Sequence, residues 1–173
     1  STPAFATVVS VRTGRIQRHD RPDWDEKRTD WDTAYWKDEV SGPVHVGPLG
    51  LDGDQQADKR HHGGPEMAVL MYANAHYAHW RTLPLLERMG PGGFGENLTL
   101  DGTDETQVCV VDVLDVGSVR LQISSPRGPC MDIARRWNDA GLLQRVVDLR
   151  RTGWYLRVLR AGKPRTRTVN DGI

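Results

Sequence analysis

Hydrophobic and polar residues alternate in several short segments of the 173-residue chain. Such alternation over four to eight residues is typical of strands with one buried face, and a short continuous apolar run such as EMAVLMY also has strand length. Asp115 to Ser118 are placed to form a hairpin turn between two of these segments. Strands are predicted at residues 4–12, 43–54, 66–72, 97–100, 108–117, 118–125 and 153–163.

Helical spacing of apolar residues occurs in only three segments, 73–90, 129–137 and 140–151. Pro84 predicts a break in the first segment, and Gly90 predicts its end. Residues 19–42 are polar, contain several tryptophans and lack periodicity, so we interpret them as an irregular excursion or flap. The predicted fold class is mainly β (α+β), a curled antiparallel sheet or β-barrel with a few peripheral helices.

Composition narrows the function classes. The length predicts a single domain over residues 1–173. Lysine and arginine equal aspartate and glutamate at 23 each, so no basic excess indicates nucleic acid, and residues 145–167 are interpreted as a solvated basic face. No apolar run approaches the roughly 20 residues of a membrane helix, and no secretory signal is recognised. The two cysteines predict free thiols in a reducing compartment, the cytoplasm.

Cys130 is the main candidate for chemistry. It follows Pro129, which is acceptable at a helix start, so we expect Cys130 in the first turn of a helix. Backbone N–H groups there and the charge of Arg127 favour a thiolate, the form that a metal ligand or nucleophile needs. Structural packing is an equally good reading of Cys130. Cys109, in the alternating segment VCVVDV, is predicted to be a core residue.

Other polar clusters are less specific. Residues 50–69 place Lys59, Arg60, His61 and His62 beside Gly63 and Gly64, which fits either an anion-binding loop or a surface hairpin. Glu96 and Asn97 either reach a ligand or cap a turn. His76 and His79 are three residues apart, but without further zinc ligands they predict a partly buried aromatic helix face. Rossmann, P-loop and α/β-hydrolase motifs are not found in the sequence.

Four sequence blocks together resemble the MOSC domain family in its YiiM-like branch. They are GLDGDQQAD with the following HHGG, FGENL, PRGPC, and TGWYLRVL, within residues 43–159. The segment WDTAYWKDEVSGPV is similar to the lead-in of many bacterial members. The resemblance implies a β-barrel-like fold that binds a molybdenum–pterin cofactor, the molybdenum cofactor, or carries sulfur through the cysteine of the PRxPC block, which is Cys130 here.

The resemblance also implies residue roles. Cys130 would be the molybdenum ligand and the catalytic residue, a soft thiolate on a soft metal. The cofactor pocket would be lined by His62, Gly63, Gly64, Asn97 and Arg127, while Asp54 would either bind the pterin or hold its loop. Relatives in the family reduce N-hydroxylated bases and amidoximes. Longer members continue into a C-terminal helical extension that this sequence lacks, and pyridoxal phosphate is not expected because the domain of full sulfurases that binds it is missing.

Three functions follow as hypotheses. The first is a molybdenum-dependent oxidoreductase that reduces small N-oxygenated compounds with electrons from a separate flavin or iron–sulfur reductase. The second is a non-catalytic carrier of the cofactor, or of sulfur as a Cys130 persulfide. The third is ligand binding without a metal. The identity of the substrate, the electron donor and any oligomeric state stay open.

Overall fold

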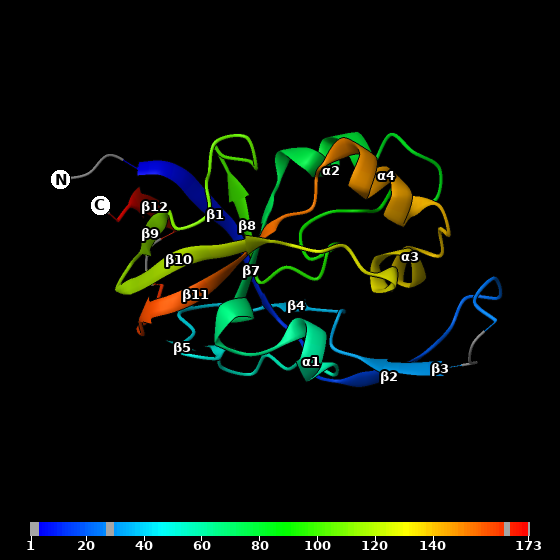
Figure 1. The fold of residues 1–173 in the computed structure, drawn as a ribbon, viewed down its shortest axis with the longest axis horizontal. Helices are drawn as coiled ribbons and strands as arrows, with labels where there is room; N and C mark the ends of the chain where they lie inside the picture. Colours follow the sequence, from blue (N-terminus) through cyan, green and yellow to red (C-terminus); the bar gives the residue numbers. More distant parts are fainter. Residues whose placement is uncertain (1–3, 27–29, 165–166, 173) are drawn as a thin grey trace.

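A closed barrel of seven strands forms the body of the protein (Figure 1). The computed structural model describes residues 4–26, 30–164 and 167–172. Around the barrel, neighbours pair in the order β1, β12, β9, β10, β11, β7, β8, and β1 closes the ring by pairing with both β8 and β12. The strands are β1 (Ala4–Thr13), β7 (Val69–Ala73), β8 (Leu98–Asp101), β9 (Val113–Val116), β10 (Val119–Pro126), β11 (Trp154–Arg160) and β12 (Thr168–Asp171). The predicted fold class is confirmed.

One pair of barrel strands departs from the expected antiparallel arrangement. β7 and β8 run parallel, with Met71 opposite Leu98. A parallel pair needs a crossover connection, which here consists of α2 (Ala75–Trp80) and the turns that follow it. The helix predicted over 73–90 is much shorter in the structure. It ends at Trp80, before the break that was expected at Pro84.

Alternating side chains fill the barrel. Along β10, Val119, Leu121 and Ile123 are buried, while the residues between them are partly exposed. A second apolar cluster contains Phe94 together with residues of α2, α3 (Met131–Trp137) and α4 (Leu142–Leu149). In Figure 1 α3 and α4 lie at the right and α2 at the upper centre. His76 is buried and His79 partly exposed in α2, as expected for an aromatic helix face. None of the helices in the described residues has the length and apolar character to cross a bilayer.

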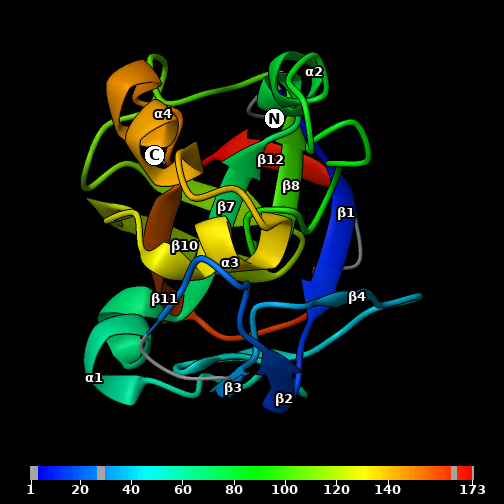
Figure 2. The ribbon, with the colours of Figure 1, turned by 90° about the vertical axis from the view of Figure 1, so that its right-hand side faces the viewer.

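The polar segment near the N-terminus forms a second, smaller structure. β2 (Gln17–Asp20) pairs with β3 (Asp30–Thr33), and β4 (Asp38–Glu39) pairs with the end of β1. We call residues 17–36 the flap hairpin; its residues 27–29 lie outside the described part. In Figure 2 the flap hairpin lies below α3 and beside α1 (Lys59–His62). β5 (Val46–Gly47), β6 (Gly50–Leu51) and the 3-10 helix η1 (Pro65–Met67) complete this side.

The core position predicted for Cys109 is wrong. Cys109 is exposed, and β9 begins only at Val113. The backbone N–H of Cys109 donates to the Asp112 carboxylate, and Val111 adopts a φ of 72°, a left-handed conformation that cannot continue a strand. A local turn therefore interrupts the alternating pattern of VCVVDV. Both cysteines are free thiols, as expected.

Candidate functional site

Two hollows meet beside Cys130. The inner cavity, counted together with the open space at its mouth, spans about 640 Å³. The outer cleft, of about 1250 Å³, opens between the flap hairpin, α1 and the start of α3. Six residues line both hollows, and we call them the throat: Asp32, Ala57, Asp58, His62, Cys130 and Asp132. Cys130 thus lines both hollows.

Cys130 occupies the position immediately before α3, one residue earlier than the predicted first turn. Its side chain makes no capping hydrogen bond to the helix, so the thiol is not tied to the backbone. Burial acts to raise the pKa of the Cys130 thiol, but the hydrogen bond with His62 and the positive charge of Arg127 outweigh burial, and the pKa is lowered. The site therefore favours the thiolate, the form that binds a soft metal.

His62 approaches Cys130 from the end of α1. The Asp58 side chain accepts hydrogen bonds from the backbone N–H groups of Arg60 and His61, which starts this short helix. The Nδ1 atom of His62 lies 3.5 Å from the hydroxyl of Tyr155. The hydrogen bond with Cys130 raises the pKa of His62 despite its burial. The thiol and the imidazole therefore stabilise each other's charged forms.

Arg127 forms the buried wall behind Cys130. Its Nη1 donates to the carbonyl of Phe94 over 2.6 Å, and its guanidinium lies 5.6 Å from the ring centre of Tyr35. The residue is only 6% exposed, yet its Nε has no hydrogen-bond partner among the described residues. An unsatisfied buried donor costs about 1–3 kcal/mol. Arg127, which lines the inner cavity, thus carries a buried donor for which the described part of the chain supplies no acceptor.

Asp54 and Asn97 line the inner cavity within a saturated hydrogen-bond network. Asp54 accepts from Lys37 Nζ at 2.6 Å, from the backbone N–H of Gly14 at 2.9 Å and from Asn97 Nδ2 at 3.0 Å. The Asn97 amide also accepts from the backbone N–H of Leu70. For both residues the geometry therefore favours a structural role over ligand binding. For Asp54, this is the loop-holding role that the sequence offered as one of two alternatives.

Not all of the predicted site residues line the inner cavity. The glycines of the HHGG block do not line the inner cavity: Gly64 faces a neighbouring surface groove, and Gly63 packs against Lys59. Glu96 is fully buried, and its carboxylate accepts from Tyr77, Thr99 and the backbone of Phe94, which supports the turn-capping alternative. Five of the predicted residues, Asp54, His62, Asn97, Arg127 and Cys130, come together around one cavity. Their roles toward a cofactor remain predictions.

Sequence reasoning missed the contribution of the flap hairpin and of β11. Tyr35 packs its ring on Gly95, whose φ of 71° and lack of a Cβ permit the contact, and Tyr155 lines the same cavity. Lys37 follows the flap hairpin and pairs with Asp54. The signal that could have been used is the spacing of Trp31, Thr33 and Tyr35 at every second position, which is typical of a strand with a buried face.

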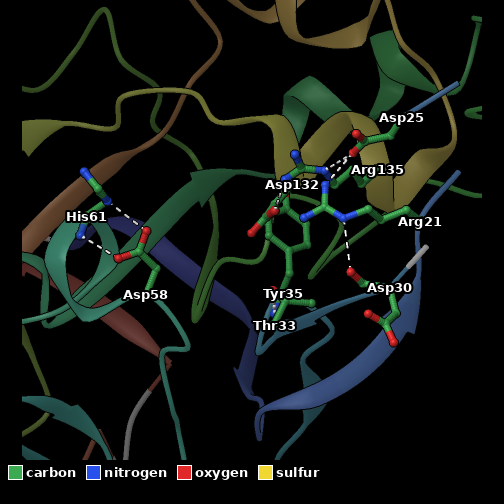
Figure 3. Close-up of polar contacts among 9 residues, drawn as sticks. All are labelled: Arg21, Asp25, Asp30, Thr33, Tyr35, Asp58, His61, Asp132 and Arg135. Atoms are coloured by element: carbon green, nitrogen blue, oxygen red, sulfur yellow. Dashed lines mark hydrogen bonds and ion pairs between the residues drawn. The ribbon is translucent and has the colours of Figure 1, made fainter. Parts of the chain in front are cut away.

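The flap hairpin is attached to α3 by ion pairs, shown in Figure 3, and by contacts of Arg21 and Arg135 with the ring of Trp31. Asp25 accepts from Arg21 at 2.6 Å and from Arg135 at 2.7 Å, and Arg135 also donates to Asp132 at 2.9 Å. Both guanidiniums lie within 6 Å of the ring centre of Trp31, at 5.8 and 5.9 Å. The flap hairpin, which lines the hollows at Cys130, is thus attached to α3, the helix that directly follows Cys130.

The donor set suits a cofactor that brings its own metal ligands. No group of three or more His, Cys, Asp or Glu side chains in the described ranges could hold a metal ion. Cys130 would therefore supply one thiolate, and the other donors would come from the cofactor. The buried cation of Arg127, whose Nε has no partner among the described residues, lines the same cavity and suits an anionic or oxygen-rich group. These observations fit the molybdenum cofactor implied by the sequence blocks.

Comparisons with known proteins agree with the resemblance. The family model described as MOSC domain matches residues 58–172. The chain is 34% identical to "Protein YiiM" of Escherichia coli (strain K12) over 157 residues, which cover 90% of this chain and 66% of that protein. It is 33% identical to "Uncharacterized protein YflK" of Bacillus subtilis (strain 168), covering 91% of this chain and 68% of the relative. Thus it spans about two thirds of the length of these relatives.

A longer relative and a solved structure complete the comparison. A protein named "Reductase" from Gibberella moniliformis (strain M3125 / FGSC 7600) is 33% identical over 164 residues, covering 93% of this chain and 28% of that protein. The crystal structure of YiiM from Geobacillus stearothermophilus superposes with a TM-score of 0.73 at 28% identity, covering 95% of this chain and 74% of that one. The fold and the sequence blocks therefore point to the same group of proteins.

Proposed function

The chain belongs to the MOSC domain family, and on that basis we propose that it binds the molybdenum cofactor and reduces small N-hydroxylated compounds. The electrons would come from a separate flavin or iron–sulfur reductase. Family membership supports an association with the cofactor. The name of the fungal relative, "Reductase", is consistent with reduction. The substrate class, the reductase and the catalytic activity are proposals for this chain.

One observation carries the proposal: Cys130 lies where the inner cavity and the outer cleft meet. The cofactor would lie on the inner side, and the outer cleft would give a small substrate access. A cysteine whose role was packing would not need a lowered thiol pKa or a place in both hollows. Cys130 is therefore the residue we assign to molybdenum.

The chain's own residues bind and orient. Cys130 would hold the metal, Arg127 would donate to the cofactor, and Tyr35 would cover it from the flap hairpin. When bound, the molybdenum cofactor supplies a centre that exchanges two electrons. In the overall reaction an N–OH group takes up two electrons and two protons, and the products are an N–H group and water. His62 and Tyr155 form a polar part of the cavity wall, with Nδ1 of His62 3.5 Å from the Tyr155 hydroxyl.

The first experiment measures the cofactor directly. The protein is made in cells that synthesise the molybdenum cofactor, and metal content and released-pterin fluorescence are compared for the unmodified chain and Cys130→Ser. We expect near-stoichiometric molybdenum and pterin in the unmodified chain and little of either in Cys130→Ser, with Cys109→Ser as the matched control that retains both. Absence of metal and pterin from the unmodified chain would contradict the proposal.

A carrier function is the second candidate, and the open side of Cys130 favours it. A carrier must hand over its cargo to another protein, and the outer cleft exposes the thiol side of the throat to the surface. Turnover separates the two candidates. An enzyme consumes benzamidoxime when a reductase and reduced nicotinamide cofactor are supplied, whereas a carrier retains cofactor or a Cys130 persulfide and consumes none.

A further inference from the structure

Two backbone carbonyls hold Arg127 in the wall of the inner cavity. Arg127 directly follows β10, and its backbone N–H donates to the carbonyl of Gly153 at 3.0 Å. At the other end of the residue, Nη1 donates to the carbonyl of Phe94 at 2.6 Å. The position of this buried cation therefore depends on the positions of Gly153 and Phe94.

Gly153 is fixed by its backbone conformation and by a carboxylate. It adopts a φ of 79°, and a Cβ there would lie 2.6 Å from the carbonyl oxygen of Met71, so a side chain does not fit. The backbone N–H of this buried glycine donates to Oε1 of Glu105 at 2.8 Å. A buried N–H requires an acceptor, and a carboxylate is a stronger acceptor than a neutral group. Gly153 is thus held by Glu105 and in turn holds Arg127.

Glu105 connects a distant helix to this turn. It lies in the connection between β8 and β9, 48 positions before Gly153. Its second carboxylate oxygen, Oε2, lies 2.5 Å from Nε2 of His76 in α2, and both side chains are largely buried. Glu105 lines neither the inner cavity nor the outer cleft. Its influence on the site must therefore pass through Gly153.

Tyr72 supports the two carbonyls from β7. Its ring stacks on Phe94 with the ring centres 4.1 Å apart and an angle of 18° between the planes. Its hydroxyl donates at 2.9 Å to the carbonyl of Arg151, two residues before Gly153. The segment 151–153 is thus tied to β7 as well as to the connection between β8 and β9. Both ends of Arg127 are therefore held by groups that are themselves fixed.

We propose that Glu105 is a positioning residue for the cofactor site, because through Gly153 it fixes Arg127 in the wall of the inner cavity. A cation strengthens binding only where its geometry is held by the residues behind it. Loss of such supporting contacts around metal sites commonly lowers affinity by about 10–100-fold. The role in cofactor binding rests on the proposed function, whereas the fixing of Arg127 can be tested without it.

Amide hydrogen exchange tests the positioning in protein made without cofactor. Glu105→Ala removes both carboxylate oxygens, and NMR of the full chain should show the amides of Gly153 and Arg127 exchanging about tenfold faster or more. Glu105→Gln keeps an acceptor for Gly153 and should stay within about twofold of the unmodified chain. Glu87→Ala, at an exposed position after α2, is the matched control. An unchanged rate at Arg127 in Glu105→Ala would overturn the inference.

A milder variant keeps the test decisive if Glu105→Ala does not fold. His76→Ala removes the partner of Oε2 and leaves Oε1 for Gly153. It should therefore speed exchange at the amides of Gly153 and Arg127, but less than Glu105→Ala does. The amide of Leu121 within β10 reports on the barrel and should keep its rate. Faster exchange at Leu121 to the same extent as at Arg127 would show a general loss of stability and contradict the assignment.

Retention of the cofactor separates this inference from the proposed function. Protein made in cells that synthesise the molybdenum cofactor is dialysed while still folded, and the loss of molybdenum and pterin is timed. Glu105→Ala should lose both about tenfold faster than the unmodified chain, and Glu105→Gln should restore the slow rate. Unchanged loss in Glu105→Ala overturns the positioning role and leaves the proposed function in place. No cofactor in the unmodified chain, with faster exchange confined to Gly153 and Arg127 in Glu105→Ala, overturns the proposed function alone.

Discussion

The barrel and the flap hairpin both line the inner cavity, but different forces hold them. The barrel side is positioned by strands whose inner residues are almost fully buried, such as Leu121 and Leu156. The flap side is positioned by ion pairs and ring contacts with α3, centred on Asp25 and Trp31. The comparison shows that apolar burial builds one wall of the site, whereas charge and aromatic contacts bring the other wall to it.

Asp54 joins the two regions. It accepts a hydrogen bond from Asn97, which immediately precedes barrel strand β8, and from Lys37, which immediately follows the flap hairpin. Because both Lys37 and Asp54 are nearly buried, their ion pair is protected from water and salt. The inner cavity thus depends on one carboxylate at the junction between a rigid barrel wall and an attached hairpin.

The largest effect on stability is expected in the barrel. Leu121→Ala removes a side chain that is 1% exposed and leaves a cavity in the main core. The free energy of unfolding should fall by about 2–5 kcal/mol, measured by urea denaturation. Leu159→Ala, at an exposed position of β11, is the control and should change it by less than about 0.5 kcal/mol. A loss of less than about 0.5 kcal/mol for Leu121→Ala as well would contradict the view that apolar burial holds the barrel side of the site.

A smaller and more local effect is expected in the flap hairpin. Asp25→Ala leaves the buried guanidinium of Arg21 and the largely buried one of Arg135 without their shared carboxylate. Charged hydrogen bonds contribute about 1.5–3 kcal/mol, and detachment of the hairpin limits the loss to that region. Amide hydrogen exchange should become faster in β2 and β3 but not in β10. Asp20→Ala, at an exposed site, is the control, and faster exchange throughout the barrel would show that the two regions are not separable.

The smallest effect is expected in the pKa of the Cys130 thiol, which lies where the two hollows meet. In protein made without cofactor, the pH midpoint for alkylation of Cys130 should lie below that of an ordinary cysteine, because His62 and Arg127 lower the thiol pKa. In His62→Ala one of these favourable contacts is lost while burial remains, so the midpoint should move to higher pH. Peptide-resolved mass spectrometry separates Cys130 from Cys109. A midpoint that does not change would show that His62 does not stabilise the thiolate.

The barrel could be predicted because its signal is local. The alternating residues of β10 and β11 and the apolar run of β7 each identify a strand within a few residues. The same local reasoning placed Cys130 at the start of a helix, since Pro129 limits where that helix can begin. It was wrong at Cys109, where alternation continues into a turn that the Asp112 side chain and the left-handed Val111 create.

The flap side could not be predicted for the opposite reason. Asp25 and Arg135 are 110 positions apart, and Trp24 donates to Asn138 across 114 positions. No periodicity within residues 19–42 reports such partners. The enclosure of the cavity by Tyr35 likewise depends on a glycine, Gly95, in a distant turn. Side-chain chemistry identified part of the site, and only the tertiary arrangement shows how its two walls meet.

Closure of the barrel has a consequence for how the protein is made. The ring is completed by pairing β1 with β12, where Ala4 lies opposite Asn170. At a synthesis rate of about 5–20 residues per second, roughly 10–30 s pass between translation of these two strands. During that interval one edge of β1 has no partner, and long-range strand pairing is slow to form. In a nascent chain the edge of β1 that pairs with β12 is therefore unpaired until synthesis ends. Truncation before β12 would leave this edge available for pairing with other strands.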